Sequence, residues 1–141
     1  MFTKKFFTAW IVSSVVMFSA FYLWHGVLLN DLSHSPYPKT IFLAVASFVY
    51  LIIGFALNSV YESRLMEKFP KKPRLKGLII GAICGAIIYF MSVVIGVSFN
   101  GGMTRVNVLI NITWQMAEQA LGGISIGFIH VSVFRRNPFA G

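Results

Sequence analysis

Residues 40–61, TIFLAVASFVYLIIGFALNSVY, decide the fold, because this stretch holds no Asp, Glu, Lys or Arg. Phe6–Asn30 and Gly77–Thr104 share that property, and Val106–Phe134 departs from it only at Glu118. Each stretch exceeds the roughly 20 apolar residues that a helix needs to cross a bilayer. The sequence lacks the alternation of apolar and polar residues that is typical of membrane β-barrels. It therefore predicts an all-α integral membrane protein, an antiparallel bundle of four transmembrane helices at about residues 6–29, 40–61, 77–99 and 107–134.

The composition agrees with a membrane protein of a single domain. Charged residues make up 11% of the chain, against roughly 25% in soluble domains. The 141 residues leave room for the four helices and for no separate soluble module, so residues 1–141 are predicted to form one transmembrane domain.

The net charge of +8 is distributed unevenly along the chain. Ten of the twelve basic residues lie in the N-terminal segment, between the second and third helices, or after the fourth, and only Lys39 and Arg105 lie in the other connections. This bias follows the positive-inside rule and predicts that both termini lie in the cytoplasm. The membrane is expected to be a bacterial inner membrane. Its expected partner is the lipid bilayer, with no nucleic acid. The ten residues are Lys4, Lys5, Arg64, Lys68, Lys71, Lys72, Arg74, Lys76, Arg135 and Arg136.

Prolines and glycines mark the predicted connections. Pro36 and Pro38 separate the first two helices, and Asn100-Gly101-Gly102 predicts a tight turn between the last two. The segment Glu62–Phe69 is amphipathic, and we expect it to continue the second helix into the cytoplasm.

Small residues recur at four-residue spacing on the third and fourth helices. Such spacing lets two helix backbones approach closely, and this packing drives association in lipid. The pattern predicts contact between helices of one protomer, with a homo-oligomer as the alternative use of one face. The glycines concerned are Gly77, Gly81, Gly85 and Gly96 on the third helix and Gly123 and Gly127 on the fourth.

Glu118 is the candidate functional residue, because a carboxyl group at bilayer depth is costly and requires a partner. It belongs to a polar stripe on the fourth helix, and the stripe is expected to face protein or water rather than lipid. Two interpretations stay open: a neutral group that bonds the helices together, and a site that binds a solute, an ion or a proton. The predicted polar pocket comprises Gln115, Glu118, Gln119, Asn111, Trp114, Tyr50 and Tyr89.

The sequence predicts no catalytic set, no cofactor and no metal. His25 and His130 are expected near opposite faces of the membrane, which argues against a haem held by both. His25, Asp31 and His34 share the outer end and are the candidate ligands for a metal ion, but their spacing matches no ligand motif.

Two motifs carry a resemblance. Trp24-His25-Gly26 ends the first helix, and Trp114-Gln115-x-x-Glu118-Gln119-x-x-Gly122-Gly123 lies on the fourth. Over its whole length the chain resembles the short four-span bacterial membrane proteins of unassigned function, and the resemblance implies no activity. Three functions therefore compete: a non-enzymatic protein whose polar pocket binds or passes a small solute, ion or proton; an accessory subunit of a larger membrane complex; and a membrane enzyme or redox carrier.

Overall fold

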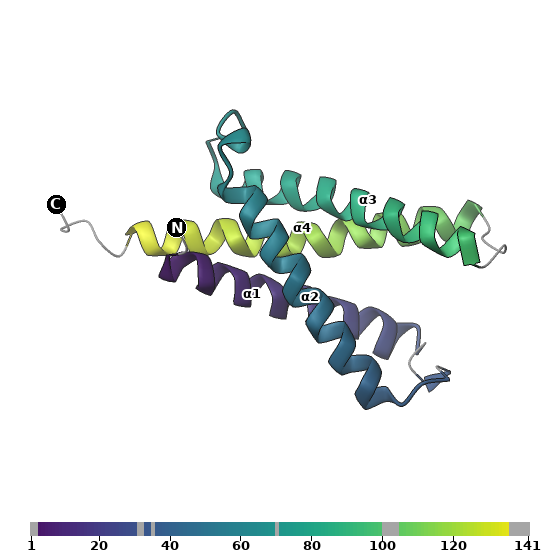
Figure 1. Cartoon of the computed structure of the whole chain (residues 1–141). Coiled ribbons are helices and arrows are strands. Elements are labelled where there is room, and N and C mark those ends of the chain that lie inside the picture. The colour runs from purple at the N-terminus through teal and green to yellow at the C-terminus, as the bar shows by residue number, and fades with distance from the viewer. Residues whose placement is uncertain (1–2, 31–32, 35, 70, 100–104, 136–141) are drawn as a thin grey trace.

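The computed structural model describes residues 3–30, 33–34, 36–69, 71–99 and 105–135, with the backbone alone for 95–99 and 133–135. The described residues form helices and connections, with no strand among them (Figure 1). Four α-helices follow in order: α1 (Lys4–Phe21), α2 (Lys39–Glu62), α3 (Pro73–Phe99) and α4 (Arg105–Arg135). A π-helix, η1 (Tyr22–Leu28), extends α1, and a short 3₁₀ turn, η3 (Arg64–Met66), follows α2.

Three of the described helices are long and apolar enough to cross a membrane: Lys4–Leu28, Lys39–Glu62 and Pro73–Val94. Helix α4 is not among them. It is the longest helix, but it carries the polar stripe around Glu118, which lowers its average apolar character. The expectation of membrane-spanning helices is therefore met for three of the four.

The four helices are arranged with alternating direction. The start of α1, the end of α2, the start of α3 and the end of α4 all lie toward one end of the molecule (Figure 1). Most of the described basic residues lie at that end, because they flank these helix termini. For brevity this end is called the basic end.

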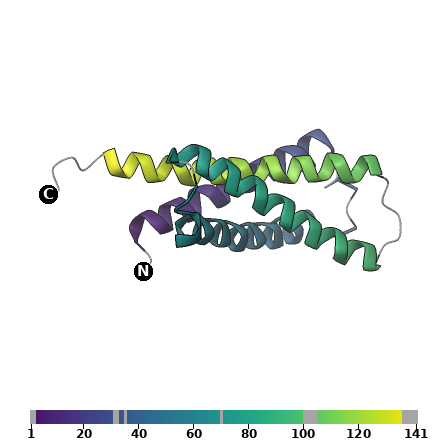
Figure 2. The same cartoon turned by 90° about the horizontal axis from the view of Figure 1, so that it is seen from above.

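Helices α3 and α4 form the most extensive pair, and glycines explain how close they come. The backbones of Gly77 and Gly123 face each other directly, and Gly127 lies against the carbonyl group of Pro73. A Cβ atom at Gly85 would lie 2.6 Å from the carbonyl oxygen of Gln115. The two helices separate toward the end of α3 (Figure 2), where Gly96 lies among the residues described by backbone alone.

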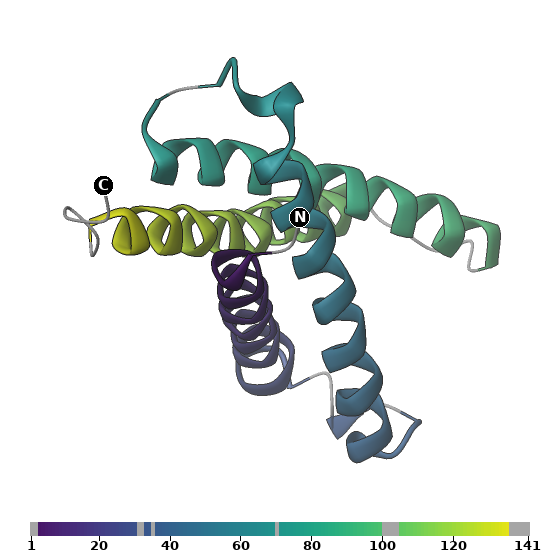
Figure 3. The same cartoon turned by 60° about the vertical axis from the view of Figure 1, so that its left-hand side comes forward.

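Helices α1 and α2 lie side by side and leave the α3–α4 pair together (Figure 3). The Trp10 indole N–H donates to the carbonyl oxygen of Leu51 at 2.7 Å, and the Asn58 amide donates to that of Phe6 at 2.9 Å. Helix α1 also packs on α4, where the side chain of Met17 fills the space above Gly122.

Helix boundaries differ from the expected ones at two connections. The segment after Glu62 does not continue α2, because Ser63 adopts an extended conformation and η3 turns the chain away. The Ser63 hydroxyl donates to the carbonyl oxygen of Val60 at 2.7 Å and so satisfies one group at this helix end. Helix α3 begins at Pro73 instead of near Gly77, which suits proline, since its missing N–H is not needed in the first turn.

Candidate functional site

Glu118 lies at the junction of α1, α2 and α4, with 1% of its surface exposed. The Tyr50 hydroxyl of α2 donates to its Oε1 atom at 2.5 Å. The Trp114 indole N–H, one turn earlier on α4, donates to Oε2 at 3.2 Å. Each carboxyl oxygen therefore has a donor of its own, one from another helix and one from the same helix.

Aromatic rings hold Tyr50 in this position. Its ring centroid lies 6.0 Å from that of Phe18, with the planes at 73°, and 5.4 Å from that of Phe21. Edge-to-face and tilted contacts of this kind are favourable for aromatic pairs. Helix α1 thus fixes the side chain of α2 that reaches the carboxyl group on α4.

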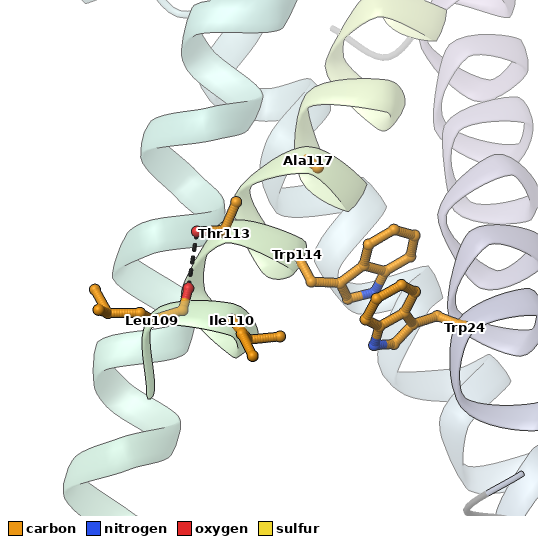
Figure 4. A pocket seen from close by; sticks show the side chains of 6 residues that line it. All are labelled: Trp24, Leu109, Ile110, Thr113, Trp114 and Ala117. Carbon is orange, nitrogen blue, oxygen red and sulfur yellow. Dashed lines mark hydrogen bonds between the residues drawn. The ribbon is translucent and has the colours of Figure 1, made fainter. Parts of the chain in front are cut away.

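A second aromatic contact fixes Trp114. Its ring stacks on Trp24 with the centroids 4.3 Å apart and the planes at 12° (Figure 4). Trp24 lies in η1, where the Leu29 N–H donates to the carbonyl oxygen of Trp24 at 2.8 Å, five residues back. The wider π-helical turn changes the direction in which the side chains of η1 project around the helix axis, compared with a continued α-helix. Such π-helical segments are often found at functional sites.

The other residues of the predicted polar pocket do not join this hydrogen-bonded group. Gln119 is fully buried, but neither atom of its amide has a partner among the described residues. The Tyr89 hydroxyl is buried and likewise without a partner there. Asn111 and Gln115 are half-buried on α4, and Gln115 contributes its backbone to the contact with Gly85. The site that the structure assembles is therefore Glu118 with Tyr50 and Trp114.

An open groove of about 370 Å³ runs beside Trp114 (Figure 4). It is lined mainly by apolar side chains, and the hydroxyl of its one threonine donates to the carbonyl oxygen of Leu109 at 2.8 Å. Glu118 is not among its lining residues, whereas Trp114, whose indole N–H donates to the carboxyl group, is one of them. The lining residues are Trp24, Leu109, Ile110, Thr113, Trp114 and Ala117.

The donor arrangement decides what the carboxyl group can bind. One O–H donor and one N–H donor point their hydrogens at its oxygens, which leaves little room for a cation that would need several oxygen ligands. A proton is different, since a carboxyl group can hold one and the Tyr50 oxygen can accept a hydrogen bond as well as donate one. The group can therefore be hydrogen-bonded in both protonation states.

The three histidines are distributed over the two ends. The ring of His25 lies 5.0 Å from that of Phe21, and His34 contacts the carbonyl oxygen of Asn30. Asp31, the third candidate metal ligand, lies outside the described residues. Within the part of the chain that the structure describes, no three His, Cys, Asp or Glu side chains are grouped to hold a metal ion.

One ionisable pair did not emerge from the sequence. His130 Nε2 on α4 lies 3.1 Å from Glu62 Oε1 at the end of α2. The two residues are 68 positions apart, and no local pattern relates them.

In comparisons with known proteins, no family model, no curated protein and no solved structure matches this chain.

Proposed function

We propose that the chain is a four-span protein of a bacterial inner membrane, with both termini in the cytoplasm. Helix α4 supports the fourth span: its 31 residues extend about 46 Å, beyond the roughly 30 Å of the hydrocarbon core. It packs along α3 through backbone contacts, and α1 and α2 cover its most polar residue. The concentration of basic residues at one end supports the orientation.

We further propose that the protein is not an enzyme and that Glu118 binds and passes a proton. One observation carries this proposal: Glu118 is 1% exposed, and each oxygen of its carboxyl group accepts a hydrogen bond. A charge in such a place costs several kcal/mol in lipid unless it is neutralised or well bonded (roughly 2.5–3.5 kcal/mol on insertion scales). Gain and loss of a proton at this site therefore changes the energy of packing α2 against α4.

The geometry favours a proton over the other predicted ligands. A solute needs a cavity beside the carboxyl group, and the lining of the open groove includes Trp114 but not Glu118. A hard cation such as Ca²⁺ or Mg²⁺ needs several oxygen ligands, whereas the Glu118 oxygens face hydrogen donors. A proton needs neither, and it can leave when Tyr50 or Trp114 moves.

The accessory-subunit hypothesis loses part of its support. It took the glycine faces of α3 and α4 as docking surfaces, but Gly77, Gly81 and Gly85 lie against α4 of the same chain. A homo-oligomer or a larger membrane complex remains a prediction of the sequence alone.

Proton flux in liposomes tests the proposal. Purified protein is reconstituted into vesicles, a pH difference is imposed, and its decay is followed with a pH-sensitive dye trapped inside. We expect wild-type protein to dissipate the pH difference and Glu118→Gln to match protein-free vesicles. The amide keeps the shape of the carboxyl group but cannot release and rebind a proton near neutral pH. Glu67→Gln is the matched control, because Glu67 is an exposed acid in the connection after α2. Equal decay in wild type and Glu118→Gln would contradict the proposal.

A further inference from the structure

The pair of Glu62 and His130 is a second link between α2 and α4. Tyr50 and Glu118 form the first, and both links join residues 68 positions apart. The second link lies twelve residues further along each helix, about 18 Å nearer the basic end. The two helices therefore run in the same general direction and are joined by titratable side chains at two levels.

The two hydrogen bonds of His130 can form together only when the pair of His130 and Glu62 holds one proton more than a neutral imidazole beside a carboxylate. Its Nδ1 atom lies 2.9 Å from the carbonyl oxygen of Ile126, which can only accept, so Nδ1 must carry a hydrogen. A neutral imidazole then has a bare lone pair on Nε2, which would face the carboxylate oxygen of Glu62 at 3.1 Å. Two acceptors repel each other. The contact is favourable only when one further proton lies on Nε2 or on Glu62.

The surroundings of His130 leave this pair in reach of water at the basic end. The side chain of His130 is 16% exposed and that of Glu62 is 34% exposed. From α2, the ring of Tyr61 lies 4.9 Å from the His130 ring, and from α3, the ammonium group of Lys76 lies 4.6 Å from the centroid of Tyr61. On α3 the Arg74 guanidinium lies over the ring of Phe128, and Lys4 and Lys5 begin α1 at the same end.

Buried apolar side chains lie between the two links, together with the buried amide of Asn58, which donates to the carbonyl oxygen of Phe6. Leu57 of α2, Ile126 of α4 and Met17 of α1 are each at most 2% exposed and lie between the two levels. Helix α2 is also the least buried of the three candidate membrane spans. Bonds to α1 and α3 also hold it, among them that of the Tyr61 hydroxyl, which donates to the carbonyl oxygen of Pro73 at 3.1 Å, whereas the two polar links join it to α4.

We propose that Glu62 and His130 form a second proton-binding site. When the site is protonated, the pair joins the end of α2 to α4, and when the proton leaves, the end of α2 separates from α4. This inference rests on the proposed function of Glu118: the pair of Glu62 and His130, on the cytoplasmic side, regulates the proton site at Glu118. The sign follows from the hydrogen bonds: the link is present at low pH and is lost as pH rises. Histidine is the side chain that ordinarily changes charge between about pH 5 and pH 8.

Two measurements on the full-length protein in lipid nanodiscs test this inference. The first is a pH titration of the imidazole nitrogens by NMR with labelled histidine, in which His130→Gln identifies the signal of His130. The second is the distance between spin labels at Leu65→Cys and Ser132→Cys, both exposed positions, with Cys84→Ala to remove the native thiol.

We expect His130 to lose its proton and the label distance to lengthen with the same midpoint. In Glu62→Gln the distance should stay short at every pH, because an amide can accept from Nε2 or donate to it. In His130→Gln the pH step should vanish, while the control Glu67→Gln should keep it. A step that persists in His130→Gln, or a short distance beside a neutral His130, would overturn the inference.

The Glu118→Gln variant separates the two proposals. It should keep the step at the basic end even though it passes no protons. An intact step together with wild-type flux in Glu118→Gln would contradict the proposed function alone. Loss of flux without any step would contradict this inference alone.

Discussion

Replacing Tyr50 by Phe removes a single oxygen atom from the buried site. The phenyl ring keeps the contacts with Phe18 and Phe21, whose centroids lie 6.0 Å and 5.4 Å away, so packing should change little. The Oε1 atom of Glu118 loses its donor at a place where only 1% of the residue is exposed. An unsatisfied buried polar group costs about 1–3 kcal/mol, and we expect the free energy of unfolding to fall by that amount.

Tyr89→Phe is the matched control for this substitution. Tyr89 is as buried as Tyr50, at 8% against 7% exposed, but its hydroxyl has no partner among the described residues. Its removal should leave the free energy of unfolding within about 0.5 kcal/mol of wild type or raise it, because no bond is lost. The two variants thus differ in one hydrogen bond.

The assay is equilibrium unfolding in mixed micelles of a mild detergent and increasing sodium dodecyl sulfate. Tryptophan fluorescence should report the transition, since Trp24 and Trp114 are stacked beside the site. Equal losses of stability in the two variants, or a larger loss in Tyr89→Phe, would refute the role assigned to the bond between Tyr50 and Glu118.

Three further predictions concern packing, the second donor and orientation. Gly81→Leu should destabilise the protein by about 1–3 kcal/mol or prevent folding, because its Cβ would meet the backbone of α4, whereas Ile83→Leu, 48% exposed on the same helix, should stay within about 0.5 kcal/mol in the same assay. Trp114→Phe should cost about 1–3 kcal/mol more than Trp24→Phe, since each shrinks the same ring stack but only Trp114 donates to the buried carboxyl group; equal costs would count against that bond. A reporter fused after Gly141 should be active in the cytoplasm, and activity only in the periplasm would reverse the orientation.

The helices could be predicted from the sequence because lipid imposes a simple rule. Long stretches without charge, such as residues 40–61, must hydrogen-bond their own backbone when they enter a membrane. The glycine spacing indicated close approach for a similar reason, since Gly77, Gly81 and Gly85 fall on one face of a helix.

The sequence did not predict which faces of the helices contact one another. Lipid-facing and buried apolar residues are alike in composition, so the sequence does not show that Trp24 meets Trp114 or that Glu62 meets His130. Tyr50 was one of several polar residues able to reach Glu118, and only the packing of α1 and α2 selects it over Tyr89.

Local backbone geometry was equally hidden. The π-helical turns that position Trp24 contain no proline, and a single glycine, Gly26, does not predict a π-helix. The end of α2 at Glu62 depends on the extended conformation of Ser63, while the amphipathic pattern beyond it favoured a longer helix.

Infrared difference spectroscopy of the Glu118 carboxyl group tests the central claim most directly. Protein in lipid is exposed to buffers from mildly acidic to mildly alkaline pH, and the C=O stretch of protonated carboxyl groups is recorded for wild type and Glu118→Gln. We predict a band from a carboxyl group shielded from water that fades as pH rises and is missing from the Gln variant. A Glu118 band that stays constant over the whole range in which the protein remains folded would contradict the account, and Glu118 would then serve only to hold the helices together.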